Sequence, residues 1–136
     1  MKKAISVSLI LLLILSMAAC GSAKLSAAFD EQQVTDRSKE IVETINTMDY
    51  DSIVSLLRED LQSQISAAEL EEAWGKQFSE AGAFVEFKQV SLAGTKSKTT
   101  NEDYAVAVLV CKYENATLTY TLSFDTSLNL VGLYMK

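Results

Sequence analysis

The sequence predicts an α+β domain in which three N-terminal helices pack on a curved four-stranded antiparallel sheet. We expect a cone-like α+β roll, preceded by a cleaved signal peptide. Two observations carry this prediction. Apolar residues recur at helical spacing between Phe29 and Gly82, and at the alternating spacing of strands between Phe84 and Met135. Helices and strands that occupy separate parts of a chain are typical of α+β domains. The domain spans residues 29–136, which is enough chain for one hydrophobic core.

The amino-terminal residues have the pattern of a bacterial lipoprotein leader. Two lysines precede an apolar run over residues 4–15, and this run is shorter than the roughly 20 residues that a membrane-spanning helix needs. Small residues and a cysteine follow in Met17-Ala18-Ala19-Cys20. The pattern predicts a signal peptide over residues 1–19 with cleavage between Ala19 and Cys20. An ordinary secretory leader that is cut nearby, with Cys20 incidental, is the alternative.

The residues around Cys20 also suggest how the protein is held at the membrane. They resemble the lipobox of bacterial lipoproteins, with Met17 where leucine is commonest. The resemblance implies that Cys20 carries a diacylglyceryl group at the extracytoplasmic face of the cell membrane. Each buried methylene contributes about 0.8 kcal/mol, so two or three acyl chains make such an anchor stable. Residues 20–28 then form the lipidated cysteine and a flexible tether with a typical span of about 16 Å.

The mature chain is acidic. The full chain has 12 basic and 18 acidic residues, and loss of Lys2 and Lys3 with the leader leaves ten basic residues and a net charge of −8. This charge disfavours binding to nucleic acid and to anionic lipid head groups. We therefore expect the lipid on Cys20 to anchor the protein without help from a basic patch.

The residue types exclude several kinds of chemistry. With Cys20 used for the anchor, Cys111 is left alone in an apolar segment, which predicts a buried thiol and no disulfide. The chain has no histidine, which excludes Ser-His-Asp and Cys-His nucleophile systems and His-ligated zinc. Asp49, Asp51 and Asp60 lack the spacing and the glycine of a calcium loop. We expect no metal, no cofactor and no catalytic activity.

Three amphipathic helices are predicted. The first runs from about Phe29 to Thr47, and the second begins at a cap formed by Asp49 or Asp51. The third begins at the capping box Ser66-Ala67-Ala68-Glu69 and ends at Gly82. Their apolar faces are, in order, Val34, Ile41, Ile45 and Met48; Ile53, Val54, Leu57, Leu61 and Ile65; and Leu70, Ala73, Trp74, Phe78 and Ala81.

Four strands are predicted to form a meander. The first covers residues 84–95, where a slip in the apolar phase predicts a β-bulge near residues 88–89. Residues 96–102, with Lys96 and Lys98, are predicted to form a polar turn. Residues 104–113 are apolar on both faces, as in a central strand that is covered on each side. Residues 117–124 alternate apolar side chains with threonine or serine, which predicts one buried and one exposed face. The last strand runs over residues 128–135 after a short turn.

Several short motifs resemble a small family of domains of unknown function, domain-of-unknown-function family 3887. They are the Asp49-Tyr50 step, Trp74 before Gly82-Ala83-Phe84, the strand end Phe124-Asp125 and the closing Val131-Gly132-Leu133. This family occurs in lipoproteins of Gram-positive bacteria and beside α/β-hydrolase domains, although this chain contains no hydrolase domain. The resemblance implies a fold like nuclear transport factor 2, also called cystatin-like, over nearly the whole mature chain. It implies no catalytic residue.

Rolls of this kind enclose a cone between sheet and helices, and in some superfamilies the cone is a pocket. The candidate lining residues are Trp74, Phe84, Tyr104 and Tyr120. Trp74 also fits a role in core packing. Glu86 and Tyr120 would be the acid–base pair of an enzyme, whereas a surface carboxylate and a core tyrosine are the simpler interpretation.

Three functions are compatible with these features. The preferred one is a non-catalytic, membrane-anchored module that binds an envelope protein, a peptide or a small apolar ligand, and no nucleic acid. A homodimer through the open sheet is a structural variant, in which the face formed by Thr117, Thr119, Thr121 and Ser123 lies against another sheet. A small isomerase- or dehydratase-like enzyme that uses the cone pocket is the alternative.

Overall fold

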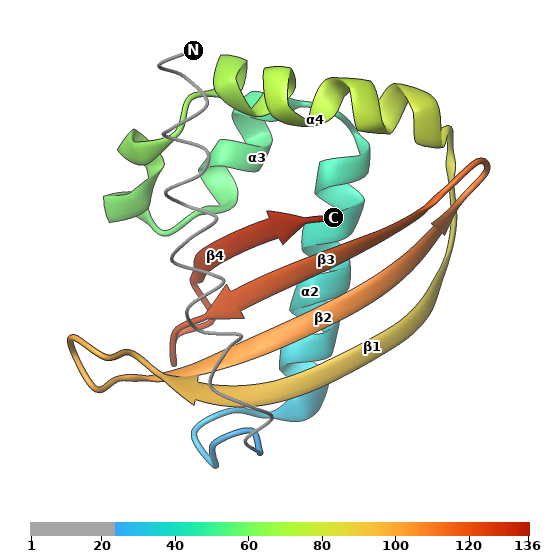
Figure 1. Ribbon diagram of the computed structural model, residues 1–136. Helices are drawn as coiled ribbons and strands as arrows, with labels where there is room; N and C mark the ends of the chain where they lie inside the picture. Colours follow the sequence, from blue (N-terminus) through green and yellow to red (C-terminus); the bar gives the residue numbers. More distant parts are fainter. Residues whose placement is uncertain (1–23) are drawn as a thin grey trace.

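The computed structural model describes residues 24–136 (Figure 1). The expected signal peptide over residues 1–19 and the lipid site at Cys20 lie outside the described residues. The elements are α2 (Glu31–Asn46), α3 (Tyr50–Leu56), the 3₁₀ helix η1 (Glu59–Gln64), α4 (Ala67–Ala81), β1 (Phe84–Lys96), β2 (Asp103–Tyr113), β3 (Thr117–Phe124) and β4 (Leu130–Met135). Helices thus precede a four-stranded antiparallel sheet, which confirms the α+β class.

The sheet is a simple meander with the strand order β1-β2-β3-β4, and all three strand pairs are antiparallel. Its strands curve around α2, which lies behind them in Figure 1, while α4 crosses the top of the molecule. Register shifts in β1 occur between Phe84 and Glu86 and between Phe87 and Gln89. The second shift confirms the bulge predicted near residues 88–89 and contributes to the bend of this long strand.

The helix ends follow local capping chemistry. The Asp30 side chain accepts a hydrogen bond from the Gln33 amide at 3.0 Å, so α2 begins two residues later than predicted. The Ser66 hydroxyl accepts from the Glu69 amide at 3.2 Å and starts α4, as the capping box predicted. Gly82 ends α4 with φ = 78°, a conformation that glycine adopts without steric cost.

The second predicted helix is wrong beyond its first two turns. Asp49 caps it as expected, but α3 ends at Leu56. Leu57 is extended and forms a parallel β-bridge with Leu130, and the Arg58 amide donates to the Leu130 carbonyl at 2.8 Å. The edge of β4 that no other strand of the sheet occupies thus supplies a backbone acceptor that competes with the helix. Leu61 and Ile65, which were predicted on the same helix, lie outside α3. Leu61 is in the 3₁₀ helix η1, and Ile65 follows η1 in an extended conformation.

One face of the sheet is packed and the other is open to solvent in part. The packed face meets the helices through alternate residues of β2 and β3: Ala105, Ala107, Leu109, Cys111, Tyr113, Leu118, Tyr120, Leu122 and Phe124. On the other face Val106, Val108 and Val110 are only partly buried. The prediction that β2 is covered on both faces therefore fails for the described residues. The one-sided burial of β3 holds along Thr117, Thr119 and Thr121, which are exposed or partly buried, but is wrong at Ser123, which was predicted on the exposed face and is fully buried. Within residues 24–136, no helix is both long and apolar enough to cross a membrane.

Candidate binding site at the start of the domain

The first described residues are fixed against the sheet. Leu25 packs on the hydrophobic core, and the Ser26 hydroxyl donates to the Asp103 carboxylate at 3.1 Å. The chain crosses β1 at Gly94, where an added Cβ would overlap the carbonyl oxygen of Lys24. Glycine is therefore required at this position by close backbone approach. Residues 24–28, which the sequence assigned to a flexible tether, are in contact with the domain.

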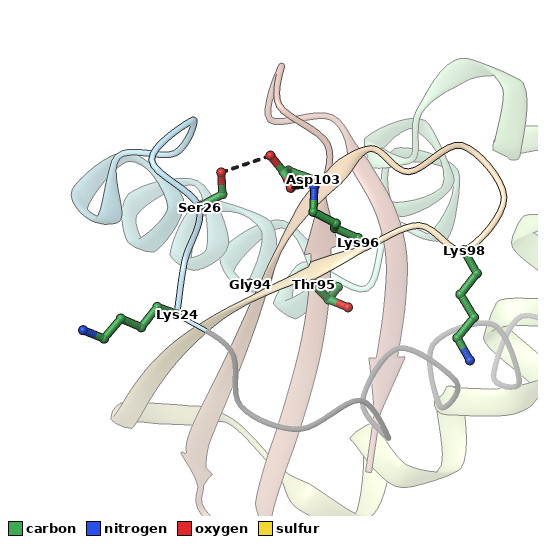
Figure 2. A pocket seen from close by; sticks show the side chains of 7 residues that line it. All are labelled: Lys24, Ser26, Gly94, Thr95, Lys96, Lys98 and Asp103. Carbon is green, nitrogen blue, oxygen red and sulfur yellow. Dashed lines mark hydrogen bonds and ion pairs between the residues drawn. The ribbon is translucent and has the colours of Figure 1, made fainter.

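A cavity of about 600 Å³ lies between this segment and the ends of β1 and β2 (Figure 2). Its lining residues carry polar or charged side chains except for one glycine, and are Lys24, Ser26, Gly94, Thr95, Lys96, Lys98 and Asp103. We call this cavity the amino-terminal cleft. The described residues that line the cleft include three lysines, two residues with hydroxyl groups and one carboxylate, so the cleft is a basic site on an acidic protein.

The only carboxylate of the cleft is already engaged. Lys96 Nζ lies 2.9 Å from Asp103 Oδ1, while Ser26 occupies the other carboxylate oxygen. The hydrogen bond from Lys96, followed by that from Ser26, lowers the pKa of Asp103 below its ordinary value. Asp103 is therefore a charged structural link between the two strands and the first residues of the domain.

The other two lysines of the cleft, Lys24 and Lys98, do not form ion pairs with the described residues. Within residues 24–136, neither Lys24 nor Lys98 has a carboxylate oxygen within 4.0 Å. Figure 2 shows their side chains on opposite sides of the cleft, pointing away from each other. Their ammonium groups are available to a ligand but do not converge on one point.

Residues 97–102 form an ordered turn beside the cleft. The Ser97 amide donates to the Glu102 carbonyl and the Asn101 amide donates to the Ser97 carbonyl, both at 2.9 Å. Asn101 has φ = 60°, which asparagine tolerates better than most residues. The sequence predicted a polar turn with lysines here. It gave no signal that residues 24–26 fold back onto it, because that contact joins segments about 70 residues apart.

The aromatic residues predicted to line a cone pocket are divided between the two faces of the sheet. Trp74 is 8% exposed and contacts Phe78 edge-on, and Tyr120 is fully buried in the same core cluster. Phe84 packs against this cluster and meets Tyr113 with the ring centroids 5.5 Å apart. Tyr104 pairs with Thr95 and precedes the buried Ala105, so its side chain lies on the opposite face.

The buried hydroxyl groups form a closed network. Tyr113 Oη donates to Asn46 Oδ1 and lies 2.6 Å from Tyr120 Oη. Burial raises the pKa of Tyr113 to about 12 and raises that of Tyr120 further. Burial also raises the pKa of the neighbouring Cys111 thiol to about 11, so these three groups keep their protons at neutral pH.

The Glu86–Tyr120 pair is not brought together. Glu86 is exposed and lies opposite the exposed Lys112 across the β1–β2 ladder, next to the inward-facing Cys111. Tyr120 points into the core from the other face of the sheet. Among the described residues, no three Asp, Glu or Cys side chains are grouped so that they could hold a metal ion.

The fold and the cleft define a small α+β domain with a helical layer on one face of an antiparallel sheet and a basic cleft where the chain enters the domain. The chain belongs to the family described as protein of unknown function (DUF3887), which matches residues 38–133. It is also similar to a protein from Ruminococcus gnavus ATCC 29149 that was solved by NMR. The two are 30% identical, the match covers 84% of this chain and 97% of that one, and the TM-score is 0.74. No curated protein matches the sequence.

Proposed function

We propose that the protein is a lipid-anchored lipoprotein on the extracytoplasmic face of a Gram-positive cell membrane, and that its domain is a non-catalytic binding module. The basic residues, short apolar run and Met17-Ala18-Ala19-Cys20 of the leader support the anchor. The helix-on-sheet arrangement supports a roll of the nuclear-transport-factor-2-like type.

The state of its ionisable groups argues against catalysis. An acid–base enzyme needs a group that exchanges protons near neutral pH beside its substrate. In the amino-terminal cleft, Asp103 is held charged by Lys96 and Ser26. In the core, Tyr113 and Tyr120 are held protonated and bond to each other. The non-catalytic assignment rests on this observation: Asp103 and the two tyrosines are already paired, and each is held in one protonation state.

The amino-terminal cleft is the binding site that we assign to this module. Its lysines and hydroxyl groups suit a polar or anionic partner.

The anchor is tested by acylation of matched cysteine variants in the native host. Palmitate labelling and partition into detergent are expected for the wild type and for Cys111→Ala. Both should be lost in Cys20→Ser. A Cys20→Ser protein that still sediments with membranes and is processed normally would exclude the lipoprotein assignment.

The binding site is tested by photo-crosslinking in cells. A photoreactive phenylalanine analogue at Thr95 samples the cleft, and the same analogue at Thr119 samples a position on the same, partly exposed face of the sheet that does not line the cleft. We expect adducts at position 95, weakened by Lys98→Glu, and few at position 119. Equal adduct yields at the two positions would contradict the assignment of the cleft, and intact mass would distinguish lipid from protein adducts.

A homodimer through the sheet is the second candidate, because Val106, Val108 and Val110 form an apolar stripe on the face that the described helices leave uncovered. A second copy of this stripe would bury it by self-complementary packing. Sedimentation equilibrium should then show a dimer that Val108→Glu dissociates. Val85→Glu is the matched control, since Val85 is an exposed valine of β1 outside the stripe. A wild-type monomer at high concentration would reject the dimer.

A further inference from the structure

We infer that the amino-terminal cleft is a second membrane contact, in which Lys24 and Lys98 bind the phosphate groups of anionic phospholipids. This inference rests on the proposed anchoring of Cys20 and names the partner of the cleft. It replaces the expectation from net charge that the lipid acts without a basic patch.

Chain length places the cleft at the membrane surface. Lys24 follows Cys20 by four residues, and a fully extended chain spans at most about 3.6 Å per residue, or roughly 14 Å in total. The Ser26–Asp103 hydrogen bond and the close approach of Lys24 to Gly94 attach this short segment to the sheet. An anchor at Cys20 therefore holds the cleft within reach of the lipid head groups.

The placement of the lysines suits a surface better than a single small anion. Lys24 and Lys98 point in different directions from the cleft (Figure 2), so they do not clamp one phosphate. An anionic bilayer presents many phosphates and each lysine near it strengthens binding about five-fold. Thr95, which also lines the cleft, adds a hydroxyl donor.

The acidic charge of the protein does not prevent this contact. Four of its carboxylates lie on α4, at the opposite end of the molecule from residues 24–30 in Figure 1: Glu69, Glu71, Glu72 and Glu80. Near the cleft, Asp103 is paired with Lys96, and Asp30 accepts from the α2 backbone, whereas Glu31 at the start of α2 is exposed. Glu102 also adjoins the cleft in sequence, and a lysine side chain is long enough to extend its ammonium group toward a head group while its stem stays on the protein. An anionic membrane should therefore orient the domain so that the amino-terminal cleft faces the lipid head groups.

Hydrogen exchange on the reconstituted lipoprotein tests the inference. The mature protein, purified with its own acyl group, is placed in nanodiscs of phosphatidylcholine alone or with phosphatidylglycerol. We expect amides of residues 97–102 to exchange several-fold more slowly with phosphatidylglycerol, while the turn at residues 114–116 is unchanged. The double variant Lys24→Gln/Lys98→Gln should lose the difference, and Lys76→Gln on the exposed surface of α4 should keep it.

The outcomes separate the two proposals. Equal exchange in the two lipids overturns the membrane contact and leaves the lipoprotein assignment intact. Failure of the protein to reconstitute because it carries no acyl group overturns the anchor instead. If inorganic phosphate in solution slows the turn as much as phosphatidylglycerol does, the cleft is a site for a free phosphate and the membrane assignment is overturned.

Discussion

Tyr113 Oη lies 2.6 Å from Tyr120 Oη in the core of the domain, and Tyr113 also donates to Asn46 at the end of α2. One hydroxyl thus joins β2, β3 and α2. Buried polar groups are costly unless they are paired, so this network helps to fix the position of α2 on the sheet.

The central position of Tyr113 predicts unequal costs for the two tyrosines. Tyr120→Phe removes one hydrogen bond and leaves Tyr113 paired with Asn46, so the free energy of unfolding should fall by about 1 kcal/mol. Tyr113→Phe leaves both Asn46 and Tyr120 without their partner and should cost about 2–3 kcal/mol. Urea unfolding measures both, with Tyr134→Phe on the other face as the control. Equal costs would show that the hydroxyl groups do not act as one network.

Asp125 should make the stability of the domain depend on acidic pH. Burial raises its pKa, but hydrogen bonds from Asn129, Arg58 and the Ser127 amide outweigh burial and leave the pKa below its ordinary value. The charged form therefore stabilises the fold above the ordinary pKa of about 3.9. This contribution is lost as pH falls through the lower folded value. Thermal unfolding across this range should show a smaller loss of stability for Asp125→Asn than for the wild type, and parallel curves would contradict the assignment.

Two serines, Ser38 and Ser123, are both fully buried but differ in whether the hydroxyl group is hydrogen-bonded. The Ser38 hydroxyl donates to the Val34 carbonyl at 2.7 Å, whereas the Ser123 hydroxyl has no hydrogen-bond partner among the described residues. Ser38→Ala should therefore lower the free energy of unfolding by about 1 kcal/mol, and Ser123→Ala should leave it unchanged or raise it. Equilibrium denaturation decides this. A loss at Ser123 as large as that at Ser38 would reveal a partner for its hydroxyl.

Two glycines should respond to alanine in opposite ways. At Gly94, the new methyl group overlaps the Lys24 carbonyl oxygen and should release residues 24–26 from the sheet, which would speed trypsin cleavage after Lys24. At Gly75 in α4, the nearest atoms are 3.9 Å away, so alanine should stabilise the helix by up to about 1 kcal/mol. Limited proteolysis and thermal unfolding measure the two effects. Unchanged cleavage in Gly94→Ala would mean that the amino-terminal segment does not rest on β1 in solution.

Trp74 provides a test of the core assignment. Since it is 8% exposed and packs edge-on against Phe78, Trp74→Ala should lower the free energy of unfolding by about 3–5 kcal/mol. Trp74→Phe should cost less because it retains most of the buried ring. Chemical denaturation followed by circular dichroism gives both values, and an alanine variant of wild-type stability would make Trp74 an exposed contact residue.

Much of the fold could be predicted because its signals are local. Asp49, Ser66 and Gly82 act on backbone groups within a few residues, and each begins or ends a helix as expected. The phase slip in β1 likewise marked the bulge near Lys88. The end of α3 could not be predicted, because Leu57 leaves the helix to pair with Leu130, which lies 73 residues further on.

The candidate site could be predicted only in part. The lysines at positions 96 and 98 were recognised as part of a polar turn, but their grouping with Lys24 depends on the chain crossing β1 at Gly94. Net charge averages over the whole surface, so it could not reveal a cleft lined by three lysines on an acidic protein. The proposed cone residues were chosen by aromatic character, which does not specify the face of the sheet on which Tyr104 lies.

The sequence by itself determined the α+β class, most helix and strand boundaries, the burial of Cys111 and the absence of histidine chemistry, because these depend on residue type and local periodicity. The tertiary structure alone decided where α3 stops, that Glu86 and Tyr120 lie on opposite faces, and that Lys24 and Ser26 complete a cleft with Lys96, Lys98 and Asp103. Each of these depends on a contact between distant segments, whose partners the local pattern does not encode.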